Sequence, residues 1–528
     1  MKLPEGWGAI LPLAVHVKSP YATYDETYRF DNGTVYAERR IEILKQKVPT
    51  ADLATYKKFA NDADLGNESY IQLTRDSASV PASSTTASPK PDAATPDAAD
   101  GPPVIPQVIE KVQGLLQKVE ELDRQQNYDG AVHVLDQIKA LNPDQPYLWG
   151  AYGEMAMKQG HRLEAIEDYK KEIKLHPASL SAYLPLAYLQ EARGLNTDAI
   201  DTLRTWVAAD PSSPDAAARL MNALLDKGDI ESALSVGDSA LAHLSETDRK
   251  NEAFQLALGR TQIAAGQKDK GAATLVAILN TSRNPTTLNN AADILANASL
   301  DLPLAEASIS ASLDKLTQQS NSWTLDDDPL QLAANTHLLV ATWETLGWIY
   351  FREGKLDQAM TYIHASWMNL PHLETGKHLG DILAAQGNKP AALACYELAL
   401  DGLPVQNSLN VPVQLINQQK QVQALANTLR RSGVGVAATL RAKKLLEPRT
   451  VPLGPANGRN GDAEYRLLLK DGKAVKIEPD GDKTIRDAED MMSKASYSAY
   501  FPKDSTAALV RNAYVNCYSD VCDLILEP

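Results

Sequence analysis

The sequence lacks any long hydrophobic run. None of its apolar stretches approaches the roughly 20 residues that a membrane-spanning helix needs, so we expect no membrane span. Positive charge is also scarce, because 52 lysines and arginines stand against 67 aspartates and glutamates, for a formal net charge of -15. Such an acidic chain is poorly suited to a nucleic-acid backbone or an anionic membrane surface. Neither is expected as the main partner.

Catalytic and metal-binding signatures are missing as well. The sequence contains neither the GxxxxGK[ST] loop that cradles phosphates nor the HExxH helix of zinc proteases. His372 and His378 have a spacing that suits neither one helix face nor a metal pair, so solvated or capping roles are favoured. Asp326, Asp327 and Asp328 lack the glycine and distal glutamate of a calcium loop and indicate a solvated helix start. We therefore expect no enzyme activity, catalytic residue, metal or cofactor.

Three residue types recur with one period of 34 residues. Alanine fits where two helices cross too closely for a larger side chain. Glycine ends a first helix in the left-handed conformation, and proline ends a second helix and turns the chain. The residues that keep the period are Ala131, Ala165, Ala199 and Ala233, then Gly160, Gly194 and Gly228, and finally Pro143, Pro177 and Pro211. The period predicts helix–turn–helix units that bury their apolar faces only by stacking on one another.

Two of these units follow a more detailed pattern. Their characteristic residues are Trp149, Tyr152, Gly153, Gly160, Ala165, Tyr169 and Pro177 in one, and Trp343, Leu346, Gly347, Tyr350, Gly354, Ala359, Ile363 and Pro371 in the other. This pattern resembles that of the tetratricopeptide family, and the resemblance covers about 300 residues. It implies a mainly α solenoid of about seven to eight helical hairpins at 108–316 and 334–450. We expect an insertion at 317–333, and polar capping helices at 411–446 that end the array.

The rest of the chain does not follow the repeat, and 528 residues are too many for one globular core. Residues 1–75 predict a small β-rich module, because alternating runs flank Asn32-Gly33, a strong hairpin signal. A helix is expected from about residue 50. Residues 76–107 are rich in Pro, Ala, Ser and Thr without apolar periodicity, and predict a disordered tether.

The N-terminal segment also carries a resemblance of its own. LPEGW, LPLAV, KSPYATY, DNGTVYAERRIEIL and VPTADLATYKKF resemble the β-rich module that follows a transglutaminase-like domain in bacterial envelope proteins. The resemblance implies a periplasmic or extracytoplasmic protein whose true start lies upstream of Met1; otherwise the chain is expected in the cytoplasm. Transglutaminase-like chemistry needs Cys, His and Asp in one site. Cys395, the only cysteine before the tail, is expected in a helix core, so that activity is not assigned to this chain.

The tail at 460–528 predicts a small C-terminal α/β domain. A Lys-Asp-Gly-Lys hairpin signal occurs at 470–473, and a helix is expected around 485–495. Cys517 and Cys522 form a C-x4-C pair for which a disulfide, free thiols and a metal site remain open, in that order. A disulfide would imply an oxidising compartment.

A solenoid of this family implies a protein or peptide partner in its concave groove. The candidate contacts occupy first-helix positions that packing does not use, and they are Glu154, Met157, Lys158, Leu184, Tyr188, Asn222, Glu344, Trp348, Phe351 and Arg352. The acidic side chains of Glu154, Glu191 and Asp226 disfavour capture of a C-terminal carboxylate. A peptide with apolar anchors and basic flanks is favoured. For Trp348 and Tyr188, packing against the neighbouring helix is an equal alternative.

The most economical hypothesis is a non-enzymatic scaffold that binds a protein or peptide. The alternative is the accessory C-terminal part of a transglutaminase-like cysteine protease or cross-linking system whose catalytic domain is not in this chain. The oligomeric state stays open.

Overall fold

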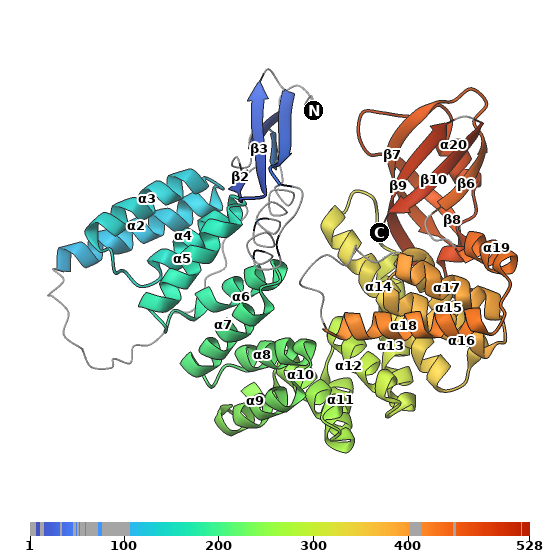
Figure 1. Cartoon of the computed structure of the whole chain (residues 1–528), viewed down its shortest axis with the longest axis horizontal. Coiled ribbons are helices and arrows are strands. Elements are labelled where there is room, and N and C mark those ends of the chain that lie inside the picture. Colours follow the sequence, from blue (N-terminus) through green and yellow to red (C-terminus); the bar gives the residue numbers. More distant parts are fainter. Residues whose placement is uncertain are drawn as a thin grey trace. The chain divides into compact units, whose positions relative to one another are not determined.

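The computed structural model divides into two compact units, Met1–Gln190 and Glu191–Pro528 (Figure 1). The residues that the structure describes are 7–10, 15–31, 34–45, 49, 52, 59, 72–75, 106–401, 413–446, 450–518 and 520–527. The expected Asn32-Gly33 turn, most of the helix expected from residue 50, and the expected tether as far as residue 105 therefore lie outside the described residues.

The N-terminal module is antiparallel β structure. Its strands are β1 (Trp7–Ile10), β2 (Val15–Lys18), β3 (Ala22–Asp31), β4 (Thr34–Ile43) and β5 (Gln72–Arg75), with sheet orders β2-β3-β4 and β1-β5. Asp31 pairs with Thr34 in the β3–β4 ladder, so the predicted hairpin is confirmed by its register. Its small core consists of Ala22, Tyr24 and Phe59.

The first unit continues with stacked helices. They are α2 (Pro106–Arg124), α3 (Tyr128–Leu141), α4 (Leu148–Lys158), α5 (Arg162–Leu175) and α6 (Tyr183–Ala192). Helices α2 and α3 pack as one hairpin and α4 and α5 as the next, with the short turns that the repeat predicts. No helix among the described residues of either unit is long and apolar enough to cross a membrane.

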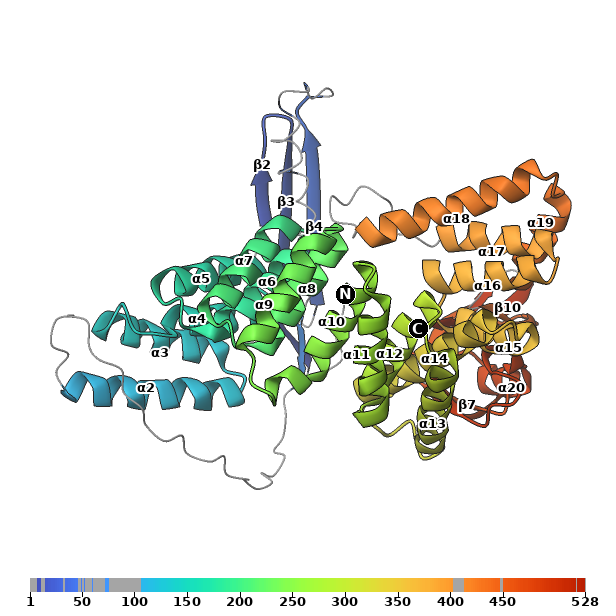
Figure 2. The ribbon, with the colours of Figure 1, turned by 90° about the horizontal axis from the view of Figure 1, so that it is seen from below.

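The second unit repeats this arrangement over most of its length (Figure 2). Its repeat helices are α7 (Asn196–Ala209), α8 (Pro214–Lys227), α9 (Ile230–His243), α10 (Glu252–Ala264), α11 (Lys268–Thr281), α12 (Pro285–Ala298), α13 (Leu302–Ser320), α14 (Pro329–Arg352), α15 (Leu356–Asn369), α16 (Leu373–Ala385) and α17 (Lys389–Asp401). The capping helices expected at its end are α18 (Val413–Arg431) and α19 (Val436–Leu446), which pack on α17. Helix α18 also contacts α16 and α8.

The periodic residues take the structural roles that their chemistry suggests. The four alanines of the repeat are at most 1% exposed. Gly160 and Gly228 end first helices with φ of +80° and +83°, where a side chain would be strained. Pro177 and Pro211 each follow the end of a second helix by two residues, because proline cannot continue it.

A buried carboxylate fixes the start of α4. Glu172 on α5 is 0% exposed and accepts hydrogen bonds from the backbone N–H groups of Tyr147 (2.7 Å), Trp149 (3.0 Å) and Gly150 (3.2 Å). The hydroxyl of Ser179 donates a fourth bond at 2.6 Å. Helix N-termini present unpaired N–H groups that attract a negative charge, so one side chain from the second helix ties the whole hairpin together.

About half of the segment 317–333, expected as an insertion, is helical. It forms the end of α13, a turn, and the first residues of α14, which makes these helices 19 and 24 residues long instead of the usual 10 to 14. Asp328 caps α14 by accepting from the N–H of Gln331 at 2.7 Å, as the expected helix start requires. The period breaks here because both helices are extended.

The C-terminal domain is a five-stranded antiparallel sheet with one short helix. Its elements are β6 (Thr450–Pro455), β7 (Gly461–Lys470), β8 (Lys473–Pro479), α20 (Ala488–Lys494), β9 (Ala508–Tyr518) and β10 (Val521–Glu527), in the sheet order β6-β10-β9-β7-β8. Lys470 pairs with Lys473 around a turn in which Asp471 and Gly472 have positive φ. The predicted hairpin and the predicted helix are both confirmed.

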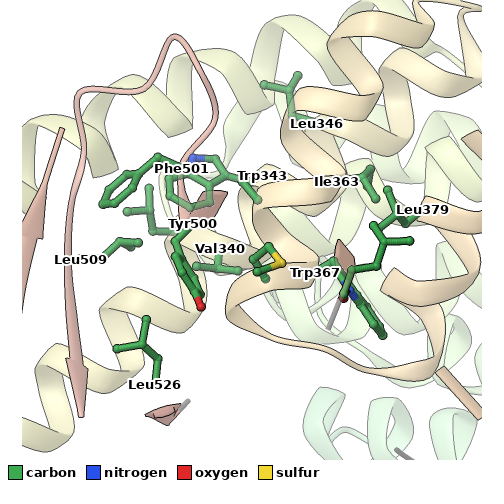
Figure 3. Packing of buried hydrophobic residues seen from close by; sticks show 14 of the residues in the cluster. Val340, Trp343, Leu346, Ile363, Trp367, Leu379, Tyr500, Phe501, Leu509 and Leu526 are labelled. Carbon is green, nitrogen blue, oxygen red and sulfur yellow. The ribbon is translucent and has the colours of Figure 1, made fainter. Parts of the chain in front are cut away.

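The extended helices hold this sheet. Trp343 of α14 packs against Phe501 with ring centroids 6.3 Å apart, inside a continuous apolar core that includes Tyr500 and Leu509 (Figure 3). Backbone groups join the two parts as well, since the N–H of Ala508 donates to the Ser320 hydroxyl at 2.9 Å. The tail therefore shares one core with the last repeats and is not packed as an independent body.

The three cysteines occupy buried positions. Cys517 and Cys522 lie opposite each other on β9 and β10, with Cα atoms 4.1 Å apart, and form a disulfide. Of the three possibilities that the sequence leaves open, the structure contains the disulfide. Cys395 is buried in α17, as expected, and burial raises the pKa of its thiol, so it is a core residue and not a reactive thiolate.

Candidate partner-binding face

First helices of successive repeats lie side by side in the second unit and form one face. Helix α10 contacts α12, α12 contacts α14, and α14 contacts α16. On this face three pairs of residues share one spacing, an acidic residue followed one turn later by a residue with a planar side chain: Asp293 and Asn297 on α12, Glu344 and Trp348 on α14, and Glu374 and His378 on α16. Residues four apart lie on the same side of a helix. The three pairs come together because Trp348 contacts both Asn297 and His378. We call these six residues the carboxylate–indole cluster.

The indole of Trp348 is the centre of the cluster. Its Nε1–H donates to Asn297 Oδ1 at 2.8 Å, which links α14 to α12. The imidazole of His378 stacks on it with centroids 3.7 Å apart and an interplanar angle of 13°, which links α14 to α16. Phe351 stacks on it at 4.9 Å. Trp348 is consequently only 4% exposed, so direct contact with a partner would require this packing to open.

Glu344 is held in its ionised form by two histidines. Its carboxylate oxygens lie 3.2 Å from His372 Nε2 and 3.4 Å from His378 Nδ1. Burial alone would oppose ionisation, but the two imidazole rings at these distances keep the pKa of Glu344 well below its usual range. His372 is also the N-cap of α16, in line with the expected capping role. His378, expected to be solvated or capping, is instead 3% exposed, because the flat Trp348 ring and the Glu344 carboxylate enclose it.

Asp293 has the opposite electrostatic environment. Burial is the largest influence and raises the pKa of its carboxyl group; the negative charges of Glu374 and Glu344 raise it further. The Asn297 amide, 3.2 Å from both carboxylate oxygens, opposes this shift, and the charge of Arg260 has a smaller effect. The negative charges of Glu374 and Glu344 therefore act on the Asp293 carboxyl group, and this repulsion favours a bound proton or a bound cation.

The cations near this face are engaged by other groups. Arg260 on α10 donates to Asn222 Oδ1 and to Asp226 Oδ1, both at 3.1 Å. Lys377 lies 2.7 Å from Asp381 and 5.4 Å from the centre of the Trp348 ring. Arg260 and Lys377 are thus held at the border of the cluster by Asn222, Asp226 and Asp381.

The sequence-predicted contacts of the second unit mostly gather here. Glu344, Trp348 and Phe351 belong to the cluster or touch it, and Arg352 donates from Nε to the Ser299 hydroxyl at 2.8 Å. Asn222 is the acceptor for Arg260. The binding role of each remains a prediction.

The predicted contacts of the first unit lie on α4 and α6. Lys158 is paired with Asp123 at 2.6 Å and with Glu154 at 2.9 Å, which leaves little of its charge for a ligand. Met157 is partly buried in the core of its own hairpins. Leu184 and Tyr188 are 38% and 58% exposed, so they offer apolar surface to a partner.

Sequence reasoning missed Asp293, Asn297 and Arg260. The repeat that contains α12 is degenerate, so its first-helix face could not be assigned by counting from the pattern. A usable signal is present all the same, because the spacing of Asp293 and Asn297 repeats that of Glu344 and Trp348.

The comparisons with known proteins agree with this repeat architecture. Residues 155–214 match the family model of the tetratricopeptide repeat. The helical part of the chain is a tetratricopeptide-type solenoid. It is flanked by the N-terminal β-rich module and the C-terminal sheet domain. No curated protein matches the chain.

Several solved structures of tetratricopeptide repeat proteins are similar to parts of this chain at low identity. A tetratricopeptide repeat protein from Parabacteroides merdae ATCC 43184 is 14% identical, with a TM-score of 0.34, and 60% of this chain covers 99% of it. YrrB, a TPR protein with an unusual peptide-binding site, is 14% identical over 34% of this chain and 91% of its own, with a TM-score of 0.28. TTC0263, a thermophilic TPR protein from Thermus thermophilus, is 18% identical over 35% and 98%, with a TM-score of 0.26. These values are too low to indicate what this chain binds.

Proposed function

We propose that the chain is a protein-interaction scaffold and that the first-helix face of its second unit binds a basic segment of a partner protein. The observation that carries this proposal is the environment of Asp293, whose pKa is raised by burial first and then by the negative charges of Glu374 and Glu344. A lysine or arginine side chain placed among these groups would relieve their repulsion and allow all three to ionise. The tetratricopeptide-type solenoid supplies the stacked first helices on which such a site is built.

The remaining contacts suit a segment with apolar residues between its basic ones. Phe351 is partly buried against Trp348 and keeps part of its ring available at the edge of the cluster. In the first unit, Tyr188 and Leu184 would serve as separate apolar contacts on α6. Aromatic side chains commonly provide such anchors at protein interfaces.

The test uses a fluorescein-labelled synthetic peptide of alternating leucine and lysine, with a leucine–glutamate peptide as its charge-reversed counterpart. Fluorescence anisotropy is measured with the full chain and with the variant Asp293→Asn/Glu374→Gln. We expect the lysine peptide to bind in preference to the glutamate peptide, and the double variant to weaken it by about tenfold, or 1.4 kcal/mol. Asp238→Asn is the matched control, since it removes one negative charge from the exposed side of the second helix α9. Equal binding of both peptides, or equal loss in the control, would contradict the proposal.

The disulfide supports a second, independent proposal about where the chain works. A bond between Cys517 and Cys522 persists in oxidising compartments and is rare where thiols are kept reduced. We infer an extracytoplasmic location. Because all three cysteines are buried, the endogenous protein is alkylated in denaturant with a thiol reagent, before and after reduction. One thiol, that of Cys395, should be labelled before reduction and all three after it. Labelling of three thiols without reduction would place the chain in a reducing compartment.

A further inference from the structure

A cleft lies where α14 meets the C-terminal sheet, away from the carboxylate–indole cluster. Its empty volume is about 410 Å³, part of it open to solvent. Leu332 and Ala333 of α14 form one apolar wall, and Val510 of β9 faces them from the sheet. The lining residues come from the first turns of α14 and from β7 and β9, so the cleft lies between the helix and the sheet.

Two donors at this cleft are buried without a partner. Thr336 is 2% exposed, and its hydroxyl makes no hydrogen bond among the described residues. The Nε–H of Arg466 on β7 is buried and likewise has no acceptor within that part of the chain. Buried donors in native proteins nearly always find an acceptor, and an acceptor group in the cleft would satisfy both members of this pair.

The other guanidinium nitrogens of Arg466 fix its orientation. Nη1 donates to the Leu325 carbonyl oxygen at 3.0 Å, and Nη2 lies 3.7 Å from Glu478 Oε2, beyond hydrogen-bonding distance. Glu478 is also paired with Lys476 at 2.7 Å. The edge formed by Nε and Nη2 therefore retains donor capacity, and this edge is one that takes a carboxylate with two parallel bonds.

The lining of the cleft carries no negative charge. Its described residues include Arg466, His337 and Asn512 but no aspartate or glutamate, in a chain whose net charge is -15. Burial, and then the charge of Arg511, lower the pKa of His337, so its ring is neutral at pH 7 and can accept or donate a hydrogen bond. An anion entering the cleft meets donors without meeting a fixed carboxylate in its lining.

We propose that this cleft binds a carboxylate carried on a short aliphatic group, either a free acid or the C-terminal residue of a peptide. The Arg466 Nε–H and the Thr336 hydroxyl donate to the carboxylate oxygens, and the aliphatic group lies between Leu332 and Val510. Glu478 is the internal competitor for Arg466, because a small rotation would bring its carboxylate into hydrogen-bonding distance.

The test measures thermal unfolding of the full chain with sodium hexanoate, with 1-hexanol as the uncharged analogue of equal chain length. Hexanoate should raise the unfolding temperature in a saturable way and hexanol should not. Thr336→Val and Arg466→Gln should each weaken hexanoate binding by about tenfold or more, and Thr336→Ser should retain it. Glu478→Gln should tighten binding, a gain that cannot arise from a damaged fold.

A control variant and a dipeptide comparison complete the test of hexanoate binding. Lys473→Gln removes an exposed positive charge from the neighbouring hairpin and should leave hexanoate binding unchanged. The dipeptide N-acetyl-valyl-leucine, compared with its C-terminal amide, distinguishes a peptide terminus from a free acid as the source of the carboxylate. An equal effect of hexanoate and hexanol, or undiminished binding by Thr336→Val, would overturn the proposal.

Discussion

Replacing Glu172 by glutamine should loosen the start of α4 without displacing any core side chain. Glutamine has nearly the same shape, but it removes the charge that attracts three N–H groups and turns an amide NH2 toward donors. The backbone N–H groups of Trp149 and Gly150 donate to the same carboxylate oxygen of Glu172, and in the variant they face a weaker, uncharged acceptor. A hydrogen bond to a charged group contributes about 1.5–3 kcal/mol net. Because glutamine keeps one acceptor oxygen, we expect a total loss of about 2–3 kcal/mol.

Native-state hydrogen exchange of the full chain measures this loss where it occurs. Hydrogen exchange is chosen because it reports the opening of individual amides in a solenoid whose repeats need not unfold together. A loss of 2–3 kcal/mol corresponds to protection factors lower by about 30- to 150-fold at the amides of Tyr147, Trp149 and Gly150. Glu167→Gln on the same helix is the control, since Glu167 is exposed and paired with Lys170. Unchanged protection in Glu172→Gln would refute the capping role.

Three further predictions follow from the second unit. Because the pKa of Asp293 is raised, its contribution to the stability of the fold is present at acidic pH and is lost as pH rises through the raised value. In thermal unfolding measured between pH 5 and pH 8, Asp293→Asn should therefore show a smaller fall of the unfolding temperature with rising pH. Reducing the disulfide, or the variant Cys517→Ser/Cys522→Ser, should cost about 2 kcal/mol in urea unfolding, since the bond closes a loop with a separation of 5 residues. Trp348→Ala should destabilise the unit by about 3–5 kcal/mol, whereas Tyr188→Ala on α6 should change stability by less than about 0.5 kcal/mol; circular dichroism separates the two, and equal effects would contradict the assigned burial.

The repeat itself could be predicted because its causes are local. An alanine at a helix crossing, a glycine with positive φ and a proline after a second helix each act within a few residues of their own position. The extension of α13 and α14 has a distant cause: Ser320 accepts from the N–H of Ala508, 188 residues away, and no local pattern reports such a contact.

The candidate site could be predicted only in part, for a related reason. Glu344 and Trp348 occupy a well-defined repeat and can be found by counting. Asp293 lies in a degenerate repeat, and His378 belongs to the next one, so their meeting depends on how the helices stack. The state of the cysteine pair could not be predicted, because the strand register decides whether Cys517 and Cys522 face each other.

The pH dependence of peptide binding tests the central claim most directly. If the converging carboxylates recognise a cation, the affinity of the full chain for the leucine–lysine peptide should rise between pH 5 and pH 8, as Asp293 loses its proton. In Asp293→Asn the affinity should be lower and the rise with pH smaller, the remaining slope coming from His372 beside Glu344. An affinity that does not change with pH in the wild-type chain, or that changes equally in the variant, would contradict the assignment of this face as the partner-binding surface.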